Sequence, residues 1–344
     1  MISRRDALRL ALYSWGTVNL RYASTALQLP NGQASLGRVT VDSIRSYQEP
    51  SYKSQPIRWY RRDTLLTILG EVISENRMYR NRRWYQIGNG FIHSLYVQHI
   101  EKPTTNPTVQ EIPSEGVLGL VTVPYGQSFQ FHSGGRTSRL YRLYYETSHW
   151  VTGLEQGPDG KPWYRITDEL LKIKYFVPAS HIKIIDPESI SQLSPHVPPA
   201  DKLIRISLSK QELKAYEADR LVRQTKISSG IPSDGPSANG IPTDTPKGKY
   251  HISLKMPSKH MGDGEITAEL SAYELLGVPW NCFFTATGVA LHGTFWHDNF
   301  GSRMSHGCVN LPNQDALWLY RWTDPIIAPH EWYQMGRGTL VIVE

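Results

Sequence analysis

The chain has 344 residues, of which 40% are hydrophobic and 20% charged, so it has the composition of a globular protein rather than a disordered one. Its apolar runs are too short to cross a bilayer, and we expect no transmembrane span. A formal net charge of +6 suits anionic partners but does not choose among nucleic acid, lipid headgroups and acidic polymers. Frequent Gly, Pro, Trp and Tyr residues favour strands and turns over helix bundles.

The first 30 residues resemble a twin-arginine export signal. A pair of arginines at 4–5 precedes a moderately apolar stretch at 10–20, and small residues follow it. Arg9 and Arg21 make this stretch a poor one, so a basic amphipathic start to a cytosolic protein is the alternative. We expect export to the cell envelope, at its periplasmic or extracellular wall face.

The next part contains an internal repeat. Leu-Gly-Arg-Val-Thr-Val at 36–41 recurs as Leu-Gly-Leu-Val-Thr-Val at 118–123, and Trp-Tyr at 84–85 recurs at 163–164. Two matches in order, at nearly one offset, predict tandem modules. Each module consists of short runs of β-branched and aromatic residues between turn residues, which is typical of a small β-barrel.

Both modules resemble bacterial SH3-like domains, and we place them at 31–105 and 115–186. The first contains a basic cluster interleaved with aromatic residues; its arginines are Arg77, Arg80, Arg82 and Arg83. Such a cluster can bind single-stranded nucleic acid, but a solvated face of a small barrel is the favoured interpretation. We therefore expect no nucleic-acid partner, and we keep anionic wall polymers as a candidate partner.

The last third is predicted to be a mainly β domain with one clear helix, after a Pro-rich linker at 187–201. The expected strands are alternating or apolar runs at 203–208, 250–256, 289–291 and 338–343. A hairpin is expected with its turn near 218–220. Residues 228–245 are rich in Gly, Pro and Ser and predict a long loop. Asn313 is expected to cap the helix.

Two cysteines occur, and their surroundings differ. Cys282 lies in an apolar run and is expected to be an inert core thiol. Cys308 follows His306 and Gly307, and His292 precedes it. A thiol attacks a carbonyl as the thiolate, so it needs a nearby base and N–H donors for the oxygen that becomes negative. We therefore predict that Cys308 is a nucleophile, with one of the two histidines as its base.

The residues around Cys308 resemble the signature of the L,D-transpeptidase (YkuD-type) family. His-Gly-Thr at 292–294 and Ser-His-Gly-Cys-Val-Asn at 305–310 carry the resemblance. It extends to Thr-Pro-Lys-Gly-Lys-Tyr at 245–250 and to the closing strand at 338–343. The expected fold is therefore mainly β, with two small SH3-like β-barrels followed by a YkuD-type β-sandwich domain at 202–344 that has one or more short helices.

The resemblance implies a reaction on peptidoglycan stem peptides without a metal or cofactor. Cys308 would attack the carbonyl between the third and fourth residues of a tetrapeptide donor and release the terminal D-alanine. His292 would form the thiolate, oriented by the backbone carbonyl of Gly293. Amides of Gly307 and Cys308 would form the oxyanion hole, and His306 would shape the pocket. An amine of a neighbouring stem would then resolve the thioester into a 3→3 crosslink.

Four further residues are candidates on weaker grounds. Ser305 begins the motif and is counted with the catalytic residues. Arg303 can bind a stem carboxylate through its bidentate fork, although a plain surface arginine fits as well. Trp296 is expected to wall the cleft, together with His297. Asn310, counted with the substrate-binding residues, is expected mainly to hold the loop by hydrogen bonds.

Several alternatives remain open. A zinc site could use His292, His297, His306 and Cys308, but the spacing lacks the usual paired ligands. Water as acceptor would make the protein an L,D-carboxypeptidase. NlpC/P60-type endopeptidases also carry SH3-like modules, but there the Cys precedes its His in the chain. A non-catalytic wall-binding protein is the alternative outside the enzymes, and the complete motif disfavours it.

Overall fold

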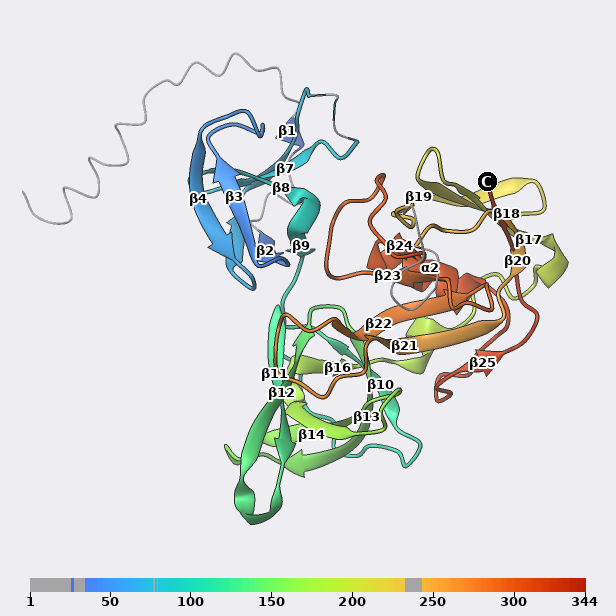
Figure 1. Cartoon of the computed structure of the whole chain (residues 1–344). Helices are drawn as coiled ribbons and strands as arrows, with labels where there is room; N and C mark the ends of the chain where they lie inside the picture. Colours follow the sequence, from blue (N-terminus) through green and yellow to red (C-terminus); the bar gives the residue numbers. More distant parts are fainter. Residues whose placement is uncertain (1–25, 28–34, 77, 79, 233–242) are drawn as a thin grey trace, which may run out of the picture.

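The computed structural model describes residues 26–27, 35–76, 78, 80–232 and 243–344. The expected export signal lies almost wholly outside these residues, as do Arg77 of the basic cluster and the centre of the 228–245 loop. The described chain is mainly β, as predicted, and Figure 1 shows it as three parts. No helix of this described part is both long and apolar enough to span a membrane.

Module 1 comprises residues 26–100 and has two antiparallel sheets, ordered β1-β6-β7-β8-β3-β4 and β5-β2-β9. Its strands are β1 (Ala26–Leu27), β2 (Ser35–Val39), β3 (Ser43–Tyr47), β4 (Pro56–Arg61), β5 (Leu65–Ile68), β6 (Gly70–Ile73), β7 (Arg83–Ile87), β8 (Gly90–His93) and β9 (Val97–Ile100). Alternation along β5 buries Leu66 and Ile68 in a core that Tyr85 and Ile92 complete. The described strands do not close into one barrel, and the SH3-like assignment stays a prediction.

Module 2 comprises residues 117–184 and forms one antiparallel sheet, ordered β12-β11-β15-β14-β13-β10-β16. Its strands are β10 (Val117–Val121), β11 (Tyr125–Phe131), β12 (Thr137–Tyr144), β13 (Ser148–Gln156), β14 (Pro162–Thr167), β15 (Lys174–Pro178) and β16 (Ile182–Ile184). The two end strands, β12 and β16, are not hydrogen-bonded to each other in the described structure. The expected barrel closure is therefore absent here as well.

The sequence repeat corresponds to equivalent strands of the two modules. β2 pairs with β9, and β10 pairs with β16, so each repeated segment lies against the last strand of its own module. The repeated glycines allow this close approach. A Cβ at Gly37 would lie 2.7 Å from Val97, and one at Gly119 would lie 2.4 Å from Ile182. Larger residues would push these strands apart.

The predicted linker is packed rather than loose. Two short 3-10 helices, Pro187–Ile190 and Pro199–Asp201, occur in it. Ile190 and Leu193 pack against the core of the C-terminal domain, and the Leu193 N–H donates to the carbonyl oxygen of Arg321. The linker therefore holds module 2 and the C-terminal domain in contact.

The C-terminal domain has two five-stranded sheets, ordered β19-β18-β17-β26-β20 and β24-β23-β22-β21-β25. Its strands are β17 (Lys202–Ser207), β18 (Glu212–Glu217), β19 (Arg220–Lys226), β20 (Gly248–His251), β21 (Leu254–Gly262), β22 (Glu274–Phe283), β23 (Ala290–Gly293), β24 (Val309–Leu311), β25 (Gln334–Met335) and β26 (Leu340–Val343). The predicted hairpin is confirmed by β18 and β19, whose turn has Ala218 at φ 50°.

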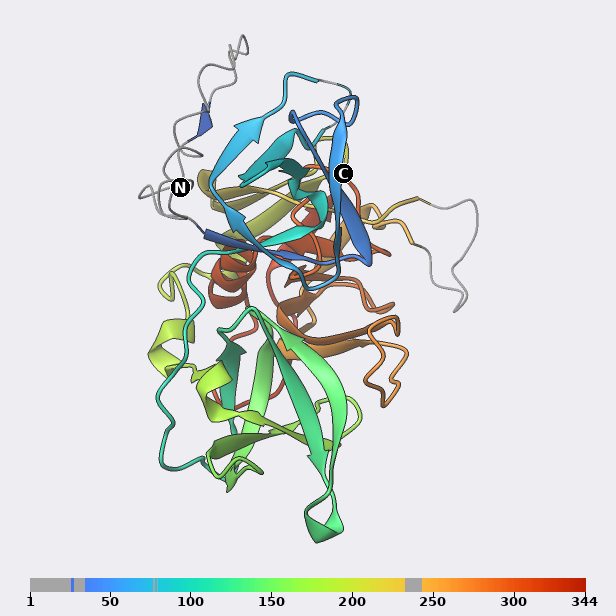
Figure 2. The ribbon, with the colours of Figure 1, turned by 90° about the vertical axis from the view of Figure 1, so that its left-hand side faces the viewer.

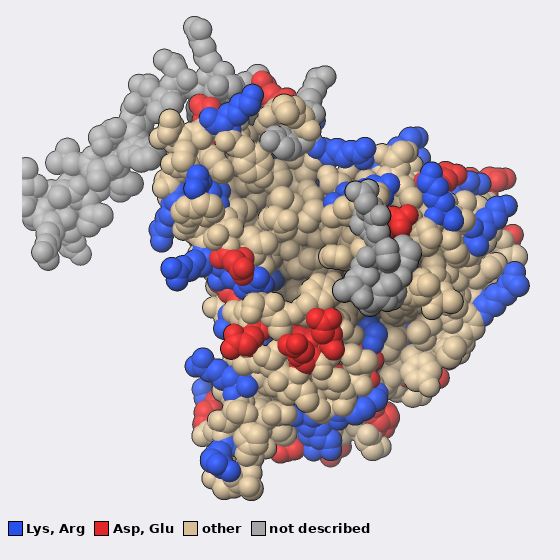
Figure 3. All heavy atoms as spheres, viewed as in Figure 1, with Lys and Arg blue, Asp and Glu red and all other residues tan. Residues whose placement is uncertain are grey.

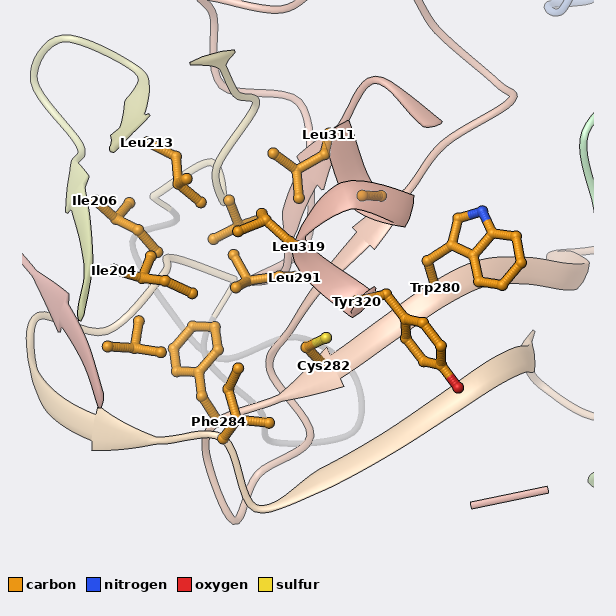
Figure 4. Packing of buried hydrophobic residues seen from close by; sticks show 14 of the residues in the cluster. Ile204, Ile206, Leu213, Trp280, Cys282, Phe284, Leu291, Leu311, Leu319 and Tyr320 are labelled. Carbon is orange, nitrogen blue, oxygen red and sulfur yellow. The ribbon is translucent and has the colours of Figure 1, made fainter. Parts of the chain in front are cut away.

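The core of this domain lies between the two sheets and one helix, α2 (Asn313–Trp322). Figure 4 shows Ile204 and Ile206 of one sheet facing Leu291 and Cys282 of the other, with Leu319 of α2 between them. The helix starts at Asn313, and Pro312 is its N-cap. The expectation that Asn313 caps the helix was therefore wrong, because Asn313 is already the first helical residue; its Nδ2 donates to Glu146 of module 2 at 2.7 Å.

Both modules lie against the C-terminal domain. Figure 2 shows module 1 (blue) and module 2 (green) meeting the C-terminal domain from two directions. A buried ion network joins all three parts: Arg38 of module 1 binds Asp63, which also binds Arg142 of module 2 at 2.5 Å. Arg38 Nη2 donates to the carbonyl oxygen of Phe295 in the C-terminal domain at 3.0 Å. The segment that follows β23 is therefore fixed from outside its own domain.

Candidate active site

Two short parallel strands bring the predicted site residues together. β23 and β24 pair in parallel, with His292 opposite Asn310, and both strands are buried along their whole length. Cys308 immediately precedes β24, so it lies at the end of the strand next to the one that carries His292. His292 and Cys308 are 16 positions apart in the sequence. The structure places them near each other because His292 lies on β23 and Cys308 immediately precedes its buried neighbour β24.

A tight turn holds Cys308. Ser305 Oγ donates to the Cys308 carbonyl oxygen and accepts from the Gly307 N–H at 3.2 Å. Gly307 has φ 118°, a conformation that other residues rarely adopt. Its carbonyl oxygen accepts from Thr245 Oγ1 at 2.7 Å. The turn is therefore fixed by Ser305 from within and by Thr245 from the far end of the 228–245 loop.

The Gly307 amide has a partner inside this turn, which bears on the expected oxyanion hole. Since the Gly307 N–H donates to Ser305 Oγ, it is already engaged in the resting structure. Hydrogen bonds of this kind can rearrange when a substrate binds. The role of the Gly307 and Cys308 amides stays a prediction.

His292 is buried and held in one tautomer. Its Nδ1 lies 2.8 Å from the carbonyl oxygen of Gly293, which can only accept, so the proton is on Nδ1 and Nε2 is free to accept one. Burial lowers the pKa of His292 to about 4, although the Gly293 carbonyl acts in the opposite direction. At neutral pH this side chain is therefore an uncharged imidazole, which is the form a general base requires.

The two cysteines differ in exposure. Cys308 is half-buried and packs against Met256, Phe283 and Ala290. Burial raises the pKa of its thiol, and a hydrogen bond from the backbone of Ala290 opposes this in part. Cys282 has no exposed surface and lies in the domain core, where burial also raises its pKa. Both are free thiols, and Cys308 is the one that solvent can reach.

The remaining predicted residues fall into two groups. Trp296 lies beside the site, with its ring 5.8 Å from that of His292, and His306, two residues before Cys308, is exposed. Arg303 and Asn310 bind the protein itself. Arg303 Nη1 donates to the carbonyl oxygen of Gly230 at 2.8 Å, and Asn310 Nδ2 lies 2.8 Å from His297 Nε2. In this structure both residues therefore hold loops in place.

Two residues near the site were not singled out from the sequence. Tyr273, in the segment between β21 and β22, has its ring 6.2 Å from that of His306. Thr245 links two loops, since its Oγ1 also accepts from the Gly230 N–H at 2.9 Å. Thr245 begins the segment at 245–250 that carries part of the family resemblance, and this resemblance could have singled it out. Nothing local in the sequence marks Tyr273.

The geometry does not favour a metal at this site. Both ring nitrogens of His297 have partners, since Nδ1 accepts from the Asn299 N–H at 3.2 Å and Nε2 lies 2.8 Å from Asn310 Nδ2. Burial lowers the pKa of His297 to about 3, so the ring is neutral. Among the residues that the structure describes, no group of three or more His, Cys, Asp or Glu side chains is placed to hold a metal ion.

The C-terminal domain is similar to a known family of catalytic domains. Residues 201–343 match the family model of the L,D-transpeptidase catalytic domain, YkuD. The match covers nearly the whole C-terminal domain, which we call the YkuD domain. This YkuD domain carries the predicted nucleophile, the predicted base and the turn between them. No comparison names modules 1 and 2.

Individual relatives are distant and only partly covered. A curated YkuD-type L,D-transpeptidase of Bacillus licheniformis is 28% identical over 116 residues, which are 34% of this chain and 56% of the relative. A solved L,D-transpeptidase of Xylanimonas cellulosilytica is 27% identical, with 42% of this chain and 60% of that chain covered and a TM-score of 0.30. One from Mycobacterium smegmatis is 16% identical, with 72% and 89% covered and a TM-score of 0.32. The chain thus spans less than two thirds of the first two relatives.

Proposed function

We propose that the YkuD domain is a cysteine acyltransferase that joins peptidoglycan stem peptides by 3→3 crosslinks. One observation carries the proposal: a neutral His292 with a free Nε2 lies on β23, beside the strand β24 that Cys308 immediately precedes. The family match supports the same chemistry. The half-buried thiol supports it too, because a nucleophile must be reachable by its substrate.

In the first step Cys308 is acylated. His292 Nε2 takes the thiol proton, and the sulfur forms a bond to the carbonyl carbon between the third and fourth residues of a tetrapeptide stem. The carbonyl electron pair moves to oxygen and returns as the C–N bond breaks. The released amine of D-alanine takes the proton from His292. The products are a thioester on Cys308 and free D-alanine.

In the second step an amine of a neighbouring stem attacks the thioester. The new amide bond forms as the C–S bond breaks, and the proton of the amine passes through His292 to the Cys308 sulfur. The energy of the bond broken in the donor is kept in the thioester, so no nucleotide is needed. Since burial raises the pKa of the thiol, the paired imidazole is required to form the thiolate.

Intact-protein mass spectrometry with a disaccharide tetrapeptide tests the proposal. We expect an adduct on the wild-type chain and on Cys282→Ala, because Cys282 is sealed in the core. We expect none on Cys308→Ala. The soluble products should be crosslinked dimers that have lost one D-alanine. An adduct on Cys308→Ala, or none on any of the three proteins, contradicts the assignment of the nucleophile.

The same experiment separates the alternatives. Tripeptide without dimers means that water resolves the thioester, which makes the protein an L,D-carboxypeptidase. Neither adduct nor product, with binding to isolated cell walls retained, favours a non-catalytic wall-binding protein. Both outcomes leave the fold unchanged, because the YkuD assignment of residues 201–343 does not depend on turnover.

We also propose that the protein acts at the cell wall, outside the cytoplasm, and that module 1 contacts anionic wall polymers. Trp59 on β4 is 56% exposed, and the Arg45 guanidinium lies 4.1 Å from the centre of its ring. An exposed aromatic side chain beside a cation suits a negatively charged polymer. A reporter fused after residue 344 should be active only outside the cytoplasm, and Trp59→Ala should weaken binding to isolated walls.

A further inference from the structure

A cavity of about 220 Å³ lies where module 1, module 2 and the YkuD domain meet. The lining residues used below come from all three parts and are Arg38, Thr40, Arg142, Tyr144, Tyr273 and Trp296. Figure 3 shows the face on which the three parts meet, hollowed between them, with acidic side chains gathered beside the hollow. The cavity exists only in the whole chain, because no single part supplies its walls.

The cavity adjoins the proposed active site on two sides. Trp296 lines it, and the ring of Trp296 lies 5.8 Å from the ring of His292. Tyr273 lines it as well, and its ring lies 6.2 Å from the ring of His306. Both histidines precede Cys308 in the sequence, and His306 is only two positions from it. A peptide held at the nucleophile can therefore extend between the two aromatic rings into the cavity.

The walls carry charges of both signs, from Arg38, Arg62 and Arg142 and from Glu269 and Glu274. Arg38 and Arg142 both bind the buried carboxylate of Asp63, at 2.8 and 2.5 Å, so two guanidinium groups share one negative charge. Arg38 lies 3.9 Å over the Tyr144 ring, and its other donors bind Gln98 and Phe295. The arrangement of the two arginines is thus rigid, and Glu269 and Glu274 supply further carboxylates on the walls.

Two donors at the cavity lack acceptors. Arg142 Nε and Thr40 Oγ1 are buried and have no hydrogen-bond partner among the described residues, and both residues line the cavity. A buried donor without an acceptor is unfavourable, and a ligand oxygen can relieve it. Glu274 at the cavity is engaged elsewhere: one oxygen lies 2.5 Å from His260 Nε2, and the other accepts from the Glu265 N–H.

We propose that this cavity binds a free carboxylate of the stem peptide while the rest of the stem lies at Cys308. The carboxylate oxygens would accept from Arg142 Nε and Thr40 Oγ1, the two buried atoms without a partner among the described residues. Modules 1 and 2 thus form part of the substrate site. This inference rests on the proposed function, since it takes a stem peptide as the substrate.

The test measures binding of a disaccharide tetrapeptide to the full-length Cys308→Ala chain by calorimetry. Three forms of the peptide are compared: unmodified, amidated at its C-terminal carboxylate, and amidated at a side-chain carboxylate of its third residue. We expect one of the two amidations to weaken binding about tenfold, as for loss of a charge-assisted hydrogen bond. That amidation identifies the carboxylate. Equal affinity for all three forms overturns the proposal.

Variants locate the effect. Thr40→Val, added to Cys308→Ala, removes one donor but keeps the shape of the side chain and every ion pair. It should reduce the difference in affinity between the unmodified and the amidated peptide severalfold, with an unchanged melting temperature. Arg142→Gln should abolish the discrimination. Arg139→Gln is the matched control, because Arg139 lies exposed on the same strand, β12, outside the cavity. Discrimination that survives both Thr40→Val and Arg142→Gln overturns the proposal.

Turnover by the wild-type chain separates this inference from the proposed function. If the peptides differ in affinity but the wild-type chain forms neither adduct nor product, the acyltransferase is contradicted and the carboxylate site is supported. Product formation that is equal for all three peptides, together with equal binding, supports the acyltransferase and overturns the carboxylate site.

Discussion

Module 1 and module 2 share a sequence repeat but meet the YkuD domain in different ways. Module 2 shares apolar cores with it: Leu118 and Trp150 belong to the core of the YkuD domain, and Leu276 belongs to that of module 2. The Trp150 ring stacks on that of Trp332, with centroids 4.8 Å apart. The core of module 1 contains residues of 39–97 alone.

Module 1 is held to the YkuD domain by polar contacts. Asp298 receives Tyr85 Oη at 2.5 Å and Arg83 Nη1 at 3.3 Å, and Arg38 reaches the Phe295 carbonyl. Apolar burial contributes stability in proportion to area, whereas a polar contact contributes little beyond replacing water. Module 2 is therefore a structural continuation of the YkuD domain, and module 1 is an attached part that can separate without unfolding it.

The largest expected effect comes from the shared core. Trp150→Ala should reduce the free energy of unfolding by about 3–5 kcal/mol, because it empties a buried site that both module 2 and the YkuD domain use. Ile92→Ala in the core of module 1 should reduce the free energy of unfolding of that module by about 2–5 kcal/mol and leave the YkuD domain unaffected. Hydrogen exchange of β23 and β24 distinguishes them: Trp150→Ala should accelerate it and Ile92→Ala should not. Equal acceleration by both would contradict the difference between the modules.

A smaller effect is expected at the polar contact of module 1. Asp298→Ala leaves the Tyr85 hydroxyl buried without an acceptor and should destabilise the attachment by about 1–3 kcal/mol. Asp298→Asn keeps an acceptor and should cost less. Arg83→Gln should cost at most about 1 kcal/mol, because its side chain is 44% exposed. Limited proteolysis between the modules measures release, and an unchanged rate for Asp298→Ala would show that other contacts dominate.

The smallest expected effect is a dependence on pH at the junction with module 2. Burial alone would lower the pKa of His260, but hydrogen bonds with Asp168 of module 2 and with Glu274 raise it above its ordinary value. Its other neighbours are the Lys259–Glu169 ion pair and the ring of Tyr141. A group whose pKa is higher in the folded state stabilises it fully below the unfolded pKa, about 6.5, and loses this contribution as pH rises through the folded pKa.

The melting temperature should therefore fall as pH rises above about 6.5, and the His260→Gln variant should lack this slope. The loss amounts to about 1.4 kcal/mol for each unit by which the folded pKa exceeds the unfolded one. A slope that His260→Gln retains would assign the dependence to another group. Asp168 behaves in the opposite sense: burial would raise its pKa, but His260 and backbone N–H groups lower it, so its contribution is lost only in acid.

The sequence could predict what depends on local pattern. Alternation along 203–208 and the turn at 218–220 gave the hairpin, because side-chain direction in a strand has period two. The motif residues around Cys308 likewise predicted a site that contains His292 and Cys308, and the structure places them on and beside the paired strands β23 and β24. The orientation of His292 by Gly293 follows from residues next to each other in the chain.

What the sequence could not predict is long-range. Nothing near Arg38 indicates that it binds Phe295, which lies 257 residues further along the chain. Asn313 looked like a helix cap, and only the docking of module 2 places Glu146 where it takes that amide. The Gly307 amide looked free for an oxyanion, and its bond to Ser305 depends on the exact fold of the turn. Contacts between parts of a chain leave no periodic signal in either part.

The pairing of β26 has a consequence for the order of assembly. β26 lies between β17 and β20, so the first strand of the YkuD domain is joined to the last one, and Val341 shares a core with Leu291 and Val309 beside the catalytic turn. A chain emerging from the ribosome cannot complete this core until residue 343 has been made. The strands that carry His292 and follow Cys308 therefore lack part of their core until β26 is in place.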